Sequence, residues 1–253
     1  MREFEQMEME FFCKPGTEMD FFKYWKQTRL NWHVNLGMGA ENYRFHDHEK
    51  LAHYANAATD IEFNFPFGFK ELEGIHSRTD FDLGNHAKLS GKKIQYYDPE
   101  TGESYTPYCV ETSIGVDRMF LAVLSHAYTV EELEGGESRV VLRIPAPLAP
   151  IKVAVLPLLK KDGLPELAQK VVDEIKYDFN YQYDEKDSIG KRYRRQDAIG
   201  TPFCVTVDHD SLKDNCVTVR DRDTMEQVRV PISELRAMID KKVNMSNLLR
   251  GLA

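Results

Sequence analysis

The stretch from Val110 to Arg118 places a carboxylate, a hydroxyl group and a guanidinium group around one predicted junction between a strand and a helix. Residues 108–113 predict a short strand, Gly115 allows the backbone to turn, and apolar residues at helical spacing follow. Arg118 then falls in the first turn of the helix, where the helix dipole favours negative charge. This position suits a polyphosphate ligand. A surface arginine on an ordinary amphipathic helix is the alternative.

Alternation at the N-terminus predicts a strand over residues 1–12 with one polar face and one apolar face. Phe4 and Glu8 share the polar face with Gln6 and Glu10, whereas Met7 falls on the apolar face. An aromatic ring on a polar face can stack on a flat ligand. The alternative is a half-exposed strand whose glutamates meet water.

Residues 71–83 contain two glutamates, a glycine and an arginine in close succession. Period-two alternation predicts that Glu71 and Glu73 point to one face of a strand, and Gly74 permits close approach of the backbone. With Arg78 nearby, this face could hold Mg²⁺, an ammonium group or a carboxylate ligand. A ladder of surface salt bridges is the alternative.

Basic side chains gather around Tyr193 in an otherwise acidic chain. They are Lys191, Arg192, Arg194 and Arg195. Basic residues that flank an aromatic ring suit phosphate contacts and base stacking, so we expect nucleic acid here. A solvated helix face is the alternative. A further cluster, His46, His48 and His53, fits no closed zinc pattern, and the helix predicted there spreads the three side chains over more than one face.

Composition predicts a globular cytoplasmic protein with no membrane partner. The chain has 253 residues, 42% of them hydrophobic and 29% charged, and no apolar run approaches the roughly 20 residues that span a bilayer. No signal peptide precedes Met1, and four widely spaced cysteines indicate a reducing compartment. The net charge of -8 argues against indiscriminate nucleic-acid binding, so such a contact should come from a local basic patch.

Three prolines within residues 144–150 predict a connector between two domains, 1–146 and 147–253. Upstream, strands that follow one another predict an antiparallel sheet flanked by helices, including an aromatic-rich helix over residues 21–32 that we assign to packing alone. Downstream, alternating strands and helices predict a compact α/β domain with a mixed sheet.

Together these motifs resemble those of the class II aminoacyl-tRNA synthetases, and among them the homodimeric glycyl-tRNA synthetases. Residues 2–8 are similar to the second strand of the family's motif 2, residues 71–83 to its central ligand-binding strand, and residues 111–118 to its motif 3. The region after Pro150 resembles the family's anticodon-binding domain. The resemblance implies an α+β fold: an incomplete antiparallel catalytic core followed by a mixed-sheet α/β anticodon-binding domain.

The resemblance also implies an activity, the ATP-dependent ligation of glycine to tRNA(Gly) through glycyl-adenylate, with ATP and Mg²⁺ as cofactors and a homodimer as the assembly. It implies that Phe4 stacks on adenine and that Arg118 binds the γ-phosphate. Glu71 would lie beside the phosphates and their Mg²⁺.

The same resemblance assigns a glycine site. Glu8, Glu111 and Ser113 would surround the ammonium group, and Arg78 would contact the carboxylate end. We therefore expect Glu111 and Arg118 to face one shared cavity, which holds the amino acid at one end and the nucleotide at the other.

The family's motif 1 and the first strand of its motif 2 are absent from the sequence. We therefore expect the chain to be a C-terminal portion that begins within motif 2 and is inactive alone. A synthetase-like accessory subunit that binds nucleic acid without catalysis is the alternative. Such a protein should have lost the ligand residues, whereas Arg78, Glu111 and Arg118 are present.

Overall fold

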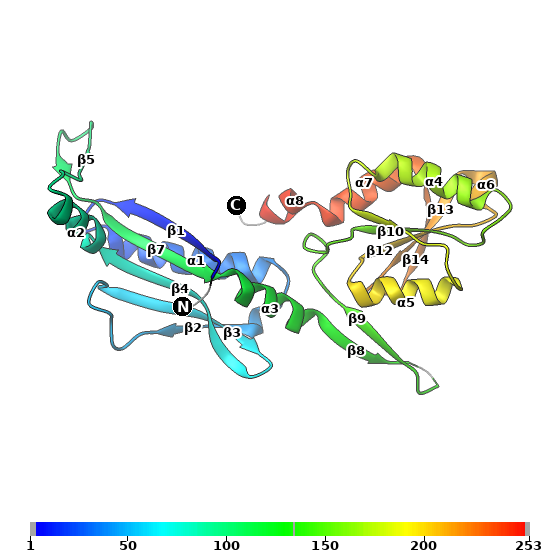
Figure 1. Ribbon diagram of the computed structural model, residues 1–253, viewed down its shortest axis with the longest axis horizontal. Helices are drawn as coiled ribbons and strands as arrows, with labels where there is room; N and C mark the ends of the chain where they lie inside the picture. The colour runs from blue at the N-terminus through cyan, green and yellow to red at the C-terminus, as the bar shows by residue number, and fades with distance from the viewer. Residues whose placement is uncertain (1–3, 134, 251–253) are drawn as a thin grey trace. The chain divides into compact units, whose positions relative to one another are not determined.

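A computed structural model of the chain describes residues 4–133 and 135–250 (Figure 1). The part of the predicted N-terminal strand that falls on residues 1–3 lies outside the described residues. The chain divides into two compact units, Met1–Ser125 and His126–Ala253. Each unit is described by itself.

The first unit is built on a five-stranded antiparallel sheet with the strand order β1-β7-β4-β3-β2. Its strands are β1 (Gln6–Cys13), β2 (Tyr43–Asp47), β3 (Ala57–Phe65), β4 (Gly68–Thr79) and β7 (Tyr108–Gly115). Its other elements are α1 (Glu18–Asn35), the short η1 (Ala40–Asn42), α2 (Phe81–Ser90), the hairpin β5 (Tyr96–Tyr97) and β6 (Ser104–Tyr105), and most of α3 (Val116–Ala127). The predicted antiparallel sheet flanked by helices is confirmed.

The two faces of this sheet differ in chemistry. Helix α1 packs against β3, β4 and β7, and the side chains beneath it are mostly apolar, such as Ile61, Ile75 and Ile114, which are each at most 2% exposed. Paired residues of an antiparallel ladder point to the same face. The pairs Glu8–Ser113 and Glu10–Glu111 therefore lie on the opposite face, which we call the open face.

A β-bulge in β4 corrects the prediction that Glu71 and Glu73 share a face. The ladder with β3 pairs Ile61 with Glu73 but Glu62 with Glu71, so Leu72 is an extra residue. Because one inserted residue reverses the side of every residue beyond it, Glu73 faces α1 and Glu71 faces the open side.

Four local predictions also differ from the structure. The N-terminal strand begins at Gln6, so Phe4 precedes it and is fully exposed. Met7 is 48% exposed rather than buried, because β1 is the edge strand of the described sheet. No helix forms around His46, because residues 43–47 form the strand β2, which pairs along its whole length with β3. Gly115 ends β7 without a positive φ.

The second unit contains the predicted mixed sheet, in the order β11-β10-β12-β13-β14, with β10 parallel to both β11 and β12. Its strands are β10 (Val153–Pro157), β11 (Tyr181–Tyr183), β12 (Phe203–Val207), β13 (Cys216–Asp221) and β14 (Gln227–Pro231). Its helices are α4 (Leu164–Ile175), α5 (Ile189–Ile199), α6 (Ser211–Asp214), α7 (Ile232–Val243) and α8 (Met245–Arg250). Side chains of α4 and α7 pack with Val153 and Val155 on one face, whereas Ile189 and Tyr193 of α5 pack with Ala154 and Leu156 on the other.

The hairpin of β8 (Tyr128–Glu132) and β9 (Ser138–Leu142) belongs to the second unit because it packs on α5. The boundary between the compact units therefore falls between Ser125 and His126, upstream of the proline segment where the domain boundary was predicted. The functional division into 1–146 and 147–253 stays a prediction. Within the described ranges, no helix combines the length and the apolar character that crossing a membrane requires.

Candidate functional site

A cavity of about 370 Å³ opens on the open face between β1, β7, the end of β4 and α2. We call it the acidic cavity. Its lining residues are Glu8, Glu10, Phe12, Arg78, Thr79, Asp82, Leu83, His86, Cys109 and Glu111. Four of these side chains are carboxylates, against one arginine and one histidine. The balance of charge in the cavity favours a cationic ligand group.

The strand register concentrates the carboxylates. Glu10 and Glu111 are direct cross-strand partners, and Glu8 is the partner of Ser113, whose hydroxyl donates to Glu8 Oε1 at 3.3 Å. Like charges directly opposite each other destabilise a ladder. A bound ammonium group would relieve this repulsion. The strand register brings together three of the four residues predicted to bind glycine, namely Glu8, Glu111 and Ser113.

Arg78, the fourth, is the cation that partly compensates the cavity. Its Nη1 donates to Glu111 Oε2 at 2.7 Å, and its Nε donates to Asp82 Oδ2 at 2.8 Å. The guanidinium group lies 4.5 Å from the ring centre of Tyr54. Burial raises the pKa of Glu111, and Glu10 and Glu8 raise it further, although Arg78 opposes them. One arginine therefore does not fully offset the burial and repulsion at Glu111.

A second cavity, of about 460 Å³, surrounds the start of α3. We call it the Arg118 cavity. It is lined by Phe65, Phe67, Lys70, Glu71, Asp117, Arg118 and Leu121. As predicted, Arg118 lies in the first turn of the helix; its Nη1 donates to the Glu71 carbonyl oxygen at 2.7 Å and lies 3.8 Å from Glu71 Oε2. A guanidinium group at a helix N-terminus can bind phosphate oxygens.

The prediction that Glu111 and Arg118 face one shared cavity is wrong for the described residues. Glu111 lines the acidic cavity and Arg118 lines the other. The two residues are separated because β7 continues from Glu111 to Gly115 before α3 begins. Phe4 lines neither cavity.

Glu71 is the residue that fits a Mg²⁺ ion delivered with phosphates. Within residues 4–133 and 135–250, no group of three or more His, Cys, Asp or Glu side chains could hold a metal by itself. Mg²⁺ needs only one or two carboxylates when phosphates and water complete its shell. The Glu71 carboxylate meets this requirement, since it is 37% exposed and borders the Arg118 cavity.

The predicted basic patch of the second unit is corrected at Arg192. This side chain is 2% exposed, and its guanidinium group donates to the carbonyl oxygens of Pro157, Asp184 and Leu158 at 2.7–3.1 Å. An arginine committed to buried carbonyl groups has no surface on which to meet nucleic acid. Tyr193 also faces the sheet, where its hydroxyl lies 2.6 Å from Thr206 Oγ1.

The other basic residues of α5 lie at the surface and differ in their partners. Arg195 pairs with Asp184 at 2.6 Å and with Asp187 at 2.9 Å, and Arg194 pairs with Glu137 at 2.5 Å. Lys191 is exposed, and among the described residues no ion pair is found for it. These three residues remain candidates for contact with nucleic acid.

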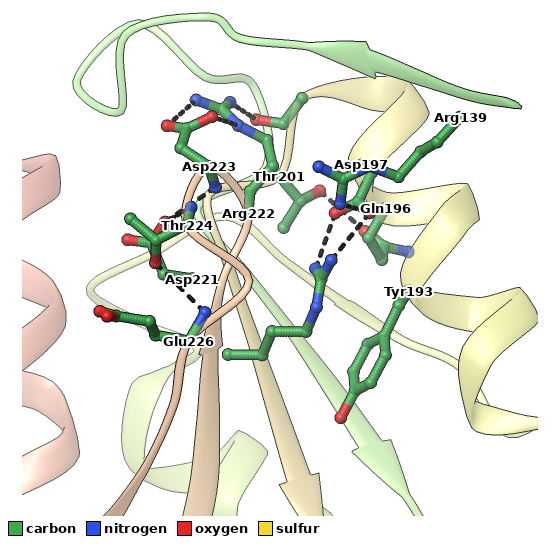
Figure 2. A network of polar contacts seen from close by, with 12 residues as sticks. Arg139, Tyr193, Gln196, Asp197, Thr201, Asp221, Arg222, Asp223, Thr224 and Glu226 are labelled. Carbon is green, nitrogen blue, oxygen red and sulfur yellow. Dashed lines mark hydrogen bonds and ion pairs between the residues drawn. The ribbon is translucent and has the colours of Figure 1, made fainter. Parts of the chain in front are cut away.

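Two sets of charged residues were missed by the sequence analysis. In the first unit, Glu10 and Asp82 line the acidic cavity; Glu10 was placed on the polar face of its strand but was given no role. In the second unit, Asp197 of α5 is 1% exposed and accepts a hydrogen bond from Arg139 at 2.9 Å (Figure 2). Arg220 donates to the same carboxylate at 2.8 Å. The second set ties β9, α5 and β13 together.

Comparison with other proteins gives these sites a context. Residues 152–242 match the family described as "Anticodon binding domain". Over 244 residues, or 96% of its length, the chain is 59% identical to a glycine–tRNA ligase of Macrococcus caseolyticus and covers 52% of that protein. Over the same span it is 57% identical to glycine–tRNA ligases of Bacillus cereus and Caldanaerobacter subterraneus subsp. tengcongensis, and covers 53% and 52% of them.

Solved structures share the fold at low identity. The crystal structure of prolyl-tRNA synthetase from Cryptosporidium parvum complexed with halofuginone and AMPPNP matches 98% of this chain and 48% of its own, with a TM-score of 0.65 and 16% identity. The same enzyme complexed with L-proline and AMP gives a TM-score of 0.64 at 17% identity.

The chain thus has the fold of class II synthetases with an anticodon-binding domain, and it spans about half of the length of the relatives it matches. The expected resemblance is confirmed: over 96% of its length the chain is similar to about half of the length of glycine–tRNA ligases.

Proposed function

We propose that this chain supplies the acidic cavity, the Arg118 cavity and the anticodon-binding unit of a cytoplasmic, homodimeric synthetase that attaches glycine to tRNA(Gly) through glycyl-adenylate. The observation that carries the proposal is the acidic cavity itself, where Glu8, Glu10 and Glu111 gather on one sheet face. The high identity to glycine–tRNA ligases supports it.

Glycine fits the charge of this cavity. Its ammonium group would be held by Glu8, Glu111 and Ser113, and its carboxylate would meet Arg78, which exchanges part of its pairing with Glu111 for the substrate. Carboxylates packed around the ammonium group leave little space for a side chain. Steric exclusion of larger amino acids avoids the limit of about 1–3 kcal/mol that recognition of one extra methylene provides.

ATP fits the second cavity. Arg118 would bind the γ-phosphate, and Glu71 would hold Mg²⁺, which neutralises phosphate charge when bound. In the first step a glycine carboxylate oxygen bonds to the α-phosphorus as the bond to pyrophosphate breaks. In the second step the terminal hydroxyl of the tRNA takes the glycyl group and AMP leaves. Neither step needs a protein nucleophile, so positioning and charge stabilisation carry the catalysis.

The remaining assignments are part of the same proposal. Phe4 would stack on adenine from the segment that precedes β1. In the second unit, Lys191, Arg194 and Arg195 would contact tRNA, whereas Arg192 holds the fold together. Residues 1–146 would belong to the catalytic domain and residues 147–253 to the anticodon-binding domain.

Glycine-dependent exchange of pyrophosphate into ATP tests this proposal. The measurement uses the complete synthetase, meaning this chain together with the part of its relatives' length that it does not span. We expect exchange with glycine but not with alanine or proline, and loss of exchange in an Arg118→Ala variant. The chain alone, purified free of host enzyme, should show no exchange. No glycine-dependent exchange by the complete synthetase would refute the activity, and exchange by the chain alone would refute the requirement for the remainder.

A further inference from the structure

Glu73 is a buried carboxylate that the proposed chemistry does not use. Its side chain is 0% exposed and faces α1. Arg29 donates to both of its oxygens, from Nε at 2.6 Å and from Nη2 at 3.2 Å, and His33 Nε2 lies 2.7 Å from Oε2. These partners lower the pKa of Glu73 although its burial raises it. We call the three residues the Glu73 clamp.

The clamp sits next to the bulge that divides β4. From Glu73 to Ser77, the strand pairs with both β3 and β7, and from Gly68 to Glu71 it pairs with β3. The second segment makes no ladder with β7 in the described sheet. A shift of register is therefore least restrained on the Glu71 side of the bulge.

The bulge decides which face receives Glu71. In a regular strand, residues two apart share a face, so Glu71 would join Glu73 beneath the sheet. With Leu72 inserted, Glu71 instead borders the Arg118 cavity and offers its carbonyl oxygen to Arg118 at 2.7 Å. Both proposed contacts to the ATP phosphates therefore depend on the bulged register.

We infer that Arg29 and His33 are positioning residues for ATP, which act from the opposite face of the sheet by holding Glu73 and thereby the bulge that presents Glu71 to Arg118. If Glu73 loses its charge, two α1 side chains lose their carboxylate. Glu71 is then the nearest carboxylate along β4 that a regular strand would bring to the α1 face. Glycine binding should not follow, because Glu111 lies on β7 and Arg78 lies beyond the stretch Glu73–Ser77, which pairs with both β3 and β7.

Kinetics of pyrophosphate exchange by the complete synthetase test this inference, which rests on the proposed function. The variants are Glu73→Gln, which keeps the shape of the side chain, and Arg29→Lys, which keeps the charge but loses the two-pronged contact. We expect the KM for ATP to rise by about 10-fold to 100-fold, while the KM for glycine changes by less than about 2-fold. Lys26→Ala is the matched control, since Lys26 also lies on α1 but pairs with Asp47 of β2.

A merely structural role would lower the active fraction, and hence kcat, without changing the KM for ATP. That result, an equal rise of both KM values, or failure of both variants to fold would overturn the inference. His33→Gln should restore most of the affinity relative to His33→Ala, because a glutamine amide can still donate to Glu73. If the unsubstituted synthetase showed no glycine-dependent exchange, the proposed function would fail instead, so the two failures are distinguishable.

Discussion

Two glutamates on one sheet, Glu73 and Glu111, have opposite electrostatic surroundings. Glu73 faces α1, is fully buried, and has Arg29 and His33 within 2.7 Å of its oxygens. Glu111 faces the acidic cavity, lies opposite Glu10, and shares Arg78 with Asp82. The pKa of Glu73 is lowered and that of Glu111 is raised. The first carboxylate is compensated by the fold, and the second is left for a ligand to compensate.

The difference separates stability from binding. A carboxylate whose charge is already compensated by its protein partners strengthens the fold but contacts no substrate directly. A carboxylate short of positive charge weakens the empty protein and gains most when an ammonium group arrives. The four predictions below test this contrast, beginning with the largest expected effect.

Glu73→Ala should cost about 3–5 kcal/mol of the free energy of unfolding, because it leaves Arg29 and the buried His33 without their carboxylate partner. Glu111→Gln should cost less than about 1 kcal/mol, since it removes a repelled charge. Urea denaturation followed by tryptophan fluorescence measures both, because the chain's two tryptophans, Trp25 and Trp32, both lie in α1. Equal losses in the two variants would remove the contrast.

Glu111→Gln should instead reduce binding. Loss of a charged hydrogen-bond partner for the ammonium group is worth about 1.5–3 kcal/mol, which corresponds to roughly a 10-fold to 150-fold fall in kcat/KM for glycine. Pyrophosphate exchange at varied glycine measures it. Glu103→Gln serves as the control, because Glu103 forms an exposed ion pair with Lys14 in the same unit. A similar fall in the control variant would refute a specific role for Glu111.

The pH dependence should differ in the same sense. Because the pKa of Glu111 is raised, its carboxylate takes up a proton at a higher pH than an ordinary glutamate, and the KM for glycine should rise by up to about 10-fold per pH unit below that pKa. Glu73 has a lowered pKa, so the stability it contributes is present above the ordinary glutamate pKa and is lost only as the pH falls through the lowered value. An acid limb of kcat/KM that Glu111→Gln does not change would contradict the first statement.

The smallest effect is expected in the second unit. There, two basic residues of α5 differ in the same way, since Arg195 pairs with carboxylates and no ion pair is found for Lys191 among the described residues. Lys191→Ala should lower tRNA affinity by up to about 1 kcal/mol and reduce the slope of its salt dependence by about 1. Arg195→Ala should change both less, since Asp184 and Asp187 already compensate that arginine. Filter binding at several salt concentrations compares them. A larger effect of Arg195→Ala would reverse the ranking.

Sequence patterns identified most elements and failed where neighbours decide. The strand predicted over residues 108–113 and the helix predicted to start just before Arg118 are both present, as β7 and α3. The faces of Glu71 and Glu73 were wrong because alternation assumes a regular ladder, and an inserted residue has no signature in one sequence. Helix α1 was assigned to packing alone, although two of its side chains, Arg29 and His33, form hydrogen bonds with Glu73.

Arg192 shows the same limit for charge. Beside Lys191, Arg194 and Arg195 it reads as one basic patch, but the helical period turns it toward the sheet, where the carbonyl groups of Pro157 and Leu158 accept its hydrogen bonds. Charge alone does not distinguish an arginine that completes the fold from one that meets a ligand.

The central claim is that the open face holds uncompensated carboxylates for a small ammonium group. Calorimetric titration of the complete synthetase with a glycyl-sulfamoyl adenylate analogue tests it most directly. We predict tight binding that weakens at least about 10-fold in Glu111→Gln, and an alanyl analogue that binds at least about 100-fold more weakly. Equal affinity for the glycyl and alanyl analogues, or binding unaffected by Glu111→Gln, would contradict the account.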